Sequence, residues 1–170
     1  MPTPTYTLIA SSTVTASGGA ANISFSSIPN TYTDLMVKIS ARTTDTNSNI
    51  RWTINGTSSG YSERMLYNSD GTAYSTSASS SYFQFLYAAN SSYTSNTFSS
   101  ADIYIPNYTG STNKPIYVDS TNENNGTSII QNLTAGLWSN SSAITSLTFG
   151  TAGGNLAQYT TAYLYGIVKS

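Results

Sequence analysis

The fold class of this chain is decided by the stretch LMVKISA, residues 35–41. In an extended chain Leu35, Val37 and Ile39 share one side, and Lys38 lies on the other. This period of two predicts a β-strand with one buried face and one solvated face.

The same alternation recurs on both sides of this stretch. Asn55-Gly56 follows one such segment directly and indicates a tight turn. The serine-rich residues 75–81 are predicted as a loop, and no segment has the length and period of a helix. Further strands are predicted at residues 6–10, 23–25, 50–54, 61–67, 82–87, 101–105, 116–118, 128–133, 144–149 and 159–168.

About ten short strands with turns between them are typical of a sandwich or barrel. We therefore expect an all-β, single-domain antiparallel β-sandwich, jelly-roll-like, with an immunoglobulin-like sandwich as the alternative. No shift of composition divides the chain. Residues 1–5, which contain Pro2 and Pro4, are expected to form an extended N-terminal arm, and residues 6–170 the domain.

The composition favours an ordered chain despite its 30 Ser and 26 Thr. Disordered segments are poor in aromatic and β-branched residues, whereas this chain has 14 Tyr, 5 Phe and 2 Trp. With six Lys or Arg and seven Asp or Glu, the net charge is −1. Solubility must therefore come from hydroxyl and amide groups.

The missing residue types exclude several functions. The chain has no His and no Cys, which removes the commonest general base, thiolate metal sites and disulfides. Six basic residues are too few for a patch that binds a nucleic-acid backbone. No apolar run is long enough to span a membrane. We expect a protein that is not an enzyme, with no catalytic residue, cofactor or metal.

The start of the chain bears on its location. The first basic residue is Lys38, and the apolar run at residues 8–10 is too short for a secretory signal. A surface rich in hydroxyls combined with no signal peptide fits a virion protein, which is made in the host cytoplasm and reaches the outside after lysis. A cytoplasmic protein of unusual composition is the alternative.

A carboxylate pair for glycoside hydrolysis and a calcium loop are two further candidate sites. A glycosidase would need two facing carboxylates among the seven present, and Asp102 and Glu63 are instead expected to face solvent or to pair with Arg or Lys. Asp45 opens a D-x-N-x-N run like that of a calcium loop, but Ile50 and Gly56 stand where Gly and Glu are required. A polar hairpin loop is the preferred interpretation there.

A glycan site would combine an exposed aromatic ring with amides and hydroxyls. Trp138 lies in a polar stretch and is the candidate exposed aromatic residue, with a loop anchor packed on the sandwich as the alternative. Trp52 alternates with Ile50 and Ile54, which favours the core.

Three segments carry a resemblance to a known class of protein. Residues 28–42, 50–56 and 161–167 resemble small β-rich virion proteins of tailed bacteriophages, particularly marine ones. The resemblance implies a β-sandwich on the virion surface, either a head decoration protein or a tail-fibre or baseplate domain. It implies no functional residue.

The first functional hypothesis is a capsid decoration, or cement, protein that binds the major capsid protein, as a homotrimer because closed symmetry is the default. The candidate contact is the N-terminal arm with the first strand residue, namely Met1, Pro2, Thr3, Pro4, Thr5 and Tyr6. The alternative is a tail module that binds a receptor or a glycan.

Overall fold

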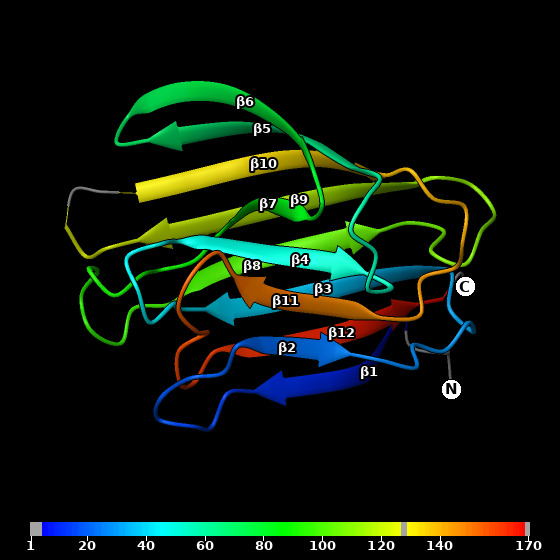
Figure 1. The fold of residues 1–170 in the computed structure, drawn as a ribbon, viewed down its shortest axis with the longest axis horizontal. Coiled ribbons are helices and arrows are strands. Elements are labelled where there is room, and N and C mark those ends of the chain that lie inside the picture. The colour runs from blue at the N-terminus through cyan, green and yellow to red at the C-terminus, as the bar shows by residue number, and fades with distance from the viewer. Residues whose placement is uncertain (1–4, 127–128, 169–170) are drawn as a thin grey trace.

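The computed structural model describes residues 5–126 and 129–168, and the chain forms twelve β-strands there and no helix. The strands make two antiparallel sheets packed face to face (Figure 1). The expected all-β, antiparallel β-sandwich is confirmed. Within the described residues there is accordingly no helix that could cross a membrane.

The larger sheet has eight strands and the smaller has four. In spatial order the larger sheet contains β1 (Tyr6–Thr13), β12 (Thr161–Ile167), β3 (Asp34–Ala41), β8 (Ser99–Ile105), β9 (Lys114–Glu123), β10 (Ile129–Trp138), β5 (Tyr61–Ser69) and β6 (Thr72–Ser80). The smaller sheet contains β2 (Asn22–Phe25), β11 (Leu147–Thr151), β4 (Asn49–Ile54) and β7 (Phe83–Tyr87). A jelly roll divides its eight strands between two sheets, so that part of the expectation is not confirmed.

The core lies between the sheets and follows the predicted alternation. Leu35 and Val37 are fully buried, and Lys38 between the apolar positions is exposed. On the smaller sheet, Trp52 packs against Phe83 with ring centroids 4.5 Å apart and against Phe149 with centroids 5.6 Å apart. Aromatic rings in such contact stabilise the sandwich beyond their buried area.

One predicted loop is wrong. Residues 75–81 fall largely in β6, which pairs with β5 along nine residues without a register shift. The alternation that identified the other strands is missing, because most β6 side chains are small and polar. The hairpin turn at Asp70 and Gly71, where both residues have a positive φ, brings the strand against β5.

The two sheets differ in width, and the candidate site described below lies on the wider one. β7, at one edge of the smaller sheet, packs over β9, β10 and β5. β6 is the outermost strand of the larger sheet on that side (Figure 1). The smaller sheet covers only one face of the larger sheet, so the opposite face, here called the outer face, meets solvent.

Candidate functional site

Large apolar side chains gather on the outer face. Leu66 is 59% exposed, Leu133 is 49% exposed and Tyr117 is 45% exposed. These three residues form what we call the outer-face patch, on β5, β9 and β10. Large apolar groups that gather on an exposed surface mark sites of interaction.

Strand register brings the patch together. Leu133 on β10 stands opposite Leu66 on β5 and opposite Asp119 on β9. Tyr117 lies two residues before Asp119 on the same face, opposite Ala135. Directly opposed side chains in antiparallel strands lie within contact distance, so the patch is continuous across three strands.

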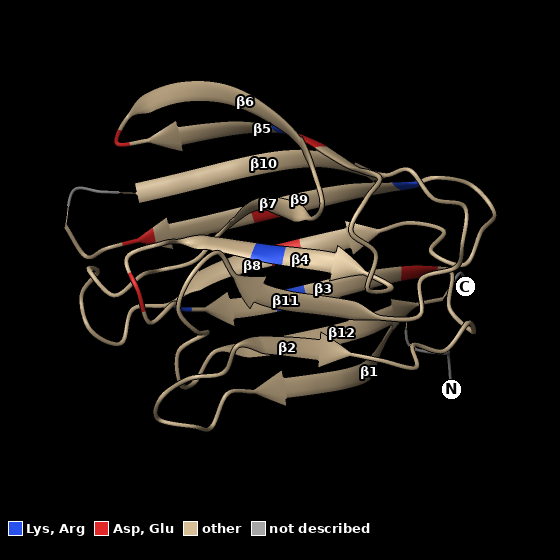
Figure 2. Ribbon diagram, viewed as in Figure 1, with Lys and Arg blue, Asp and Glu red and all other residues tan. Residues whose placement is uncertain are grey.

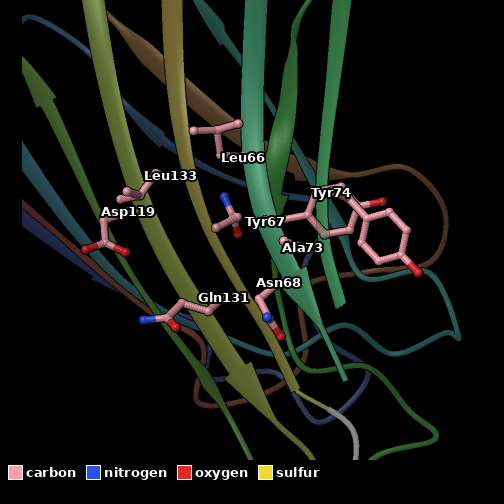
Figure 3. A pocket seen from close by; sticks show the side chains of 9 residues that line it. Leu66, Tyr67, Asn68, Ala73, Tyr74, Asp119, Gln131 and Leu133 are labelled. Carbon is pink, nitrogen blue, oxygen red and sulfur yellow. The ribbon is translucent and has the colours of Figure 1, made fainter. Parts of the chain in front are cut away.

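Polar side chains border the patch at one end. A hollow of about 570 Å³ is lined by Leu66, Leu133, Asp119, Gln131 and Asn68, together with Tyr67, Ala73, Tyr74 and Asn132. Figure 3 shows Leu66 and Leu133 on neighbouring strands, with Asn68, Gln131 and Asp119 around them. An apolar floor with a few amide and carboxylate groups is the usual make-up of a ligand site.

A second, mainly apolar hollow adjoins the first. It is lined by Tyr117, Ala135 and Arg64, with Ile116 and Thr134, and it shares Leu66 and Leu133 with the first hollow. The two hollows form one shallow, uneven surface. Such a surface suits a protein partner better than a small enclosed ligand.

The other half of the outer face carries an ion pair. Lys38 Nζ lies 2.6 Å from Asp102 Oδ2, and the two side chains are 50% and 40% exposed. The expectation that Asp102 faces solvent or pairs with a basic residue is confirmed. Asp119 stands directly opposite Asp102 on the next strand, but the two carboxylates line different hollows.

Charges are sparse over the whole molecule. Figure 2 shows the few acidic and basic residues scattered over separate strands and loops. No group of three acidic residues that could hold a metal ion occurs among residues 5–126 and 129–168. The outer-face patch therefore offers shape and apolar area rather than a strong electric field.

The inner face contains a polar seam, defined here as Glu63, Asn132 and Thr134. The carboxylate of Glu63 accepts hydrogen bonds from the backbone N–H groups of Gln84 at 2.8 Å and Phe85 at 3.3 Å. The side chains of Asn132 and Thr134 donate to the Phe85 carbonyl at 3.2 and 3.3 Å. Backbone groups at the free edge of β7 are thereby satisfied by side chains of the larger sheet.

Glu63 corrects the expectation drawn from the sequence. It neither faces solvent nor pairs with a basic residue, because it is 7% exposed between the sheets. Burial raises the pKa of Glu63 to about 7, while the hydrogen bonds from Gln84 and Phe85 oppose this rise. The carboxyl group therefore titrates near neutral pH. Its hydrogen bonds to Gln84 and Phe85 attach β7 to the larger sheet.

Lys114 is buried, and no acidic side chain of the described residues pairs with it. Its Nζ donates hydrogen bonds to the carbonyl oxygens of Gly110 at 2.6 Å and Thr112 at 2.5 Å. Burial lowers the pKa of Lys114. These hydrogen bonds fix the loop before β9, so the Lys114 amine has a structural role.

The prediction of an exposed Trp138 is wrong. Trp138 is fully buried at the end of β10, where it stands opposite Tyr61 and Lys114. Its polar sequence neighbours lie in the following loop, while the ring turns into the core. Trp52 is also buried, as its alternation with Ile50 and Ile54 predicted.

The candidate arm lies mostly outside the described residues. Met1, Pro2, Thr3 and Pro4 are among the residues that the structure does not describe. The Thr5 carbonyl accepts a hydrogen bond from the Val168 N–H at 3.1 Å. Tyr6 begins β1, is 50% exposed and lies edge-on to Tyr165.

The polar-loop interpretation of the D-x-N-x-N run is supported. The Asn47 N–H donates to Asp45 Oδ1 at 3.2 Å, and the Asn49 N–H donates to Asn47 Oδ1 at 2.9 Å. These are Asx turns, in which the side chains bond to their own backbone. Asp45 Oδ1 and Asn47 Oδ1 are thus engaged by backbone N–H groups of the same loop.

Sequence reasoning did not find the outer-face patch. In β10 the alternation is inverted, because Asn132 and Thr134 point inward and Leu133 points outward. Polarity alone would place Leu133 in the core. A signal was present nonetheless, since Leu66 follows Met65 directly and adjacent residues of a strand face opposite sides, so one of these two apolar side chains had to face outward.

The comparisons with known proteins identify no relative. No family model, no curated protein and no solved structure matches the chain.

Proposed function

We propose that the chain is a structural protein of a tailed-phage virion, a capsid decoration protein that binds the major capsid protein on the head. The outer-face patch is the observation that carries this proposal. It is an apolar surface on three paired strands, and Arg64 and Asp119 line its hollows. Added contact area between capsid subunits stabilises a shell by mass action.

The neutral surface supports the same proposal. A contact based on apolar area and hydroxyl groups changes little with ionic strength, because there are few charges to screen. This suits a particle exposed to salt water. The proposal assigns no catalytic activity to the chain.

The direct experiment measures occupancy on purified heads that lack the protein. We expect the double variant Leu66→Ser, Leu133→Ser to lose at least tenfold in affinity, since both side chains would be buried on binding. Leu8→Ser is the matched control, because Leu8 is 51% exposed on β1, far across the sheet. Equal occupancy by the double variant and the wild type would contradict the proposed contact.

The N-terminal arm is a second candidate contact, carried by the sequence alone. Removing residues 1–5 deletes one backbone hydrogen bond, that between Val168 and Thr5, from the described structure. The domain should therefore still fold. If the arm binds the capsid, the shortened protein loses its occupancy on heads while its unfolding curve stays unchanged.

A tail-fibre or baseplate module that binds glycans is the second candidate function. The specific observation is the first hollow, where Asn68 and Gln131 lie near Tyr74, which is 47% exposed. The test variant is Tyr74→Ala rather than Trp138→Ala, because Trp138 is buried. Binding on a glycan array that is lost in Tyr74→Ala would favour the tail module over the decoration protein.

A further inference from the structure

The sandwich has four sheet edges: β1 and β6 bound the larger sheet, and β2 and β7 bound the smaller one. A strand at an edge presents unpaired N–H and C=O groups, which can pair with another chain. Proteins commonly block this with short strands, bulges, charges, prolines or a covering element. The four edges differ in how they are blocked.

Three edges are protected. β1 carries an irregularity in register between Leu8 and Ala10, which interrupts its pairing pattern. β2 is only four residues long. β7 has five residues, and the polar seam caps it through Glu63, Asn132 and Thr134.

Among residues 5–126 and 129–168, β6 has none of these protections. It runs for nine residues, TAYSTSASS, with no charged residue and no proline. Its register with β5 is regular throughout, and no other strand of the described chain pairs with it. Thr72, Tyr74 and Thr76 add residue types that favour strands.

We propose that β6 pairs antiparallel with β6 of a second copy, so that the two larger sheets become one continuous sheet. The strand is uncharged, so self-pairing opposes no like charges. Antiparallel self-pairing has two-fold symmetry, and each copy then supplies the same donors and acceptors.

The sequence of β6 also fits this symmetry. With Thr76, the middle residue, on the axis, Thr76 stands opposite its own copy, and Tyr74 stands opposite Ala78. Thr–Thr pairs can hydrogen-bond across strands, and a large residue opposite a small one packs without a clash. The pairing is independent of the proposed virion function.

Pairing through β6 gives a two-fold dimer in place of the homotrimer expected from the sequence. The expected trimer rested on closed symmetry being common, whereas a self-complementary edge gives a dimer. A seam of nine residues is smaller than a standard interface of roughly 1,600 Å², so we expect a dimer that dissociates on dilution.

Sedimentation of the wild-type protein over a range of concentrations tests the dimer. We expect dimer at high concentration, and monomer at the same concentrations for Thr76→Lys, which places two positive charges on the axis. Thr13→Lys, on the exposed end of β1, is the matched control and should remain dimeric. A wild-type protein that is monomeric at every concentration overturns the proposal.

Cysteine cross-linking tests the register separately. The chain has no cysteine, so any disulfide comes from the introduced residue. Thr76→Cys should form a disulfide-linked dimer under mild oxidation, because opposed residues in antiparallel strands lie about 4.5–5.5 Å apart at Cα. Thr13→Cys should not. Cross-linking at Thr13 but not at Thr76 would show that the copies meet elsewhere.

Discussion

β6 and β7 are consecutive in the sequence and form edges of different sheets. The edge of β7 is capped by side chains, whereas the edge of β6 is open. The edge of β7 is held by Glu63, Asn132 and Thr134, which reach across from the larger sheet. The edge of β6 has no such cap among the described residues. At β7, buried polar side chains satisfy the backbone hydrogen-bonding groups of the edge. At β6, the same backbone groups are left to bond with water or with another strand.

The largest expected effect concerns the cap on β7 and depends on pH. The pKa of Glu63 rises from 4.5 to about 7 on folding. Between these values the unfolded state binds fewer protons at this group, so the contribution of Glu63 to stability is greatest below pH 4.5 and is lost as pH rises to about 7. The loss is about 3 kcal/mol, at 1.36 kcal/mol for each pH unit.

Urea unfolding of the wild type and of Glu63→Gln from pH 4 to pH 8 measures this effect. The glutamine variant has no carboxyl group to titrate there, so its stability should change less than that of the wild type. The difference between the two proteins should shift in favour of the variant as pH rises. Parallel pH profiles would mean that Glu63 does not titrate in this range.

The next effect tests the amide in the same seam. Asn132→Ala removes the donor to the Phe85 carbonyl and the acceptor for the Ser120 hydroxyl, which lies 2.5 Å from Asn132 Oδ1. We expect a loss of about 2 kcal/mol, because the buried Ser120 hydroxyl loses its acceptor and the Phe85 carbonyl keeps only the bond from Thr134.

Ser77→Ala on β6 is the control for this variant. Ser77 is exposed at the open edge, so the change should stay within about 0.5 kcal/mol. Thermal or urea unfolding of both variants gives the comparison. Equal losses at the two positions would remove the energetic distinction between the capped edge and the open edge.

The smallest effect concerns how β6 is held to its own sheet. Tyr74 stacks on Tyr67 with ring centroids 5.0 Å apart. Tyr74→Ala should cost about 1 kcal/mol, and a double-mutant cycle with Tyr67→Ala should give a coupling of about 0.5–1.5 kcal/mol. Additive losses would show that pairing with β5, rather than the rings, holds the strand.

The sequence predicts strands well where apolar residues alternate with polar ones. Leu35 and Val37 are buried as expected, and the sandwich follows from many such segments. β6 was missed because small polar side chains carry no alternation, so only its hairpin with β5 determines its structure.

The candidate site was less predictable than the fold. Trp138 has polar neighbours yet is buried, since strand pairing places it opposite Tyr61. Leu133 is exposed because Asn132 and Thr134 are needed inside to cap β7. Whether a polar residue faces inward depends on a distant backbone edge, which periodicity along one strand does not reveal.

The position of β12 has a consequence for how the chain is made. β12 lies between β1 and β3 and pairs with both. During synthesis, the edges of both early strands stay without this partner until residues 161–167 leave the ribosome. The larger sheet therefore joins β1 to β3 only after residues 161–167 have been made, and pairing between strands so distant in sequence is slow. Nascent chains are exposed to mispairing throughout that interval.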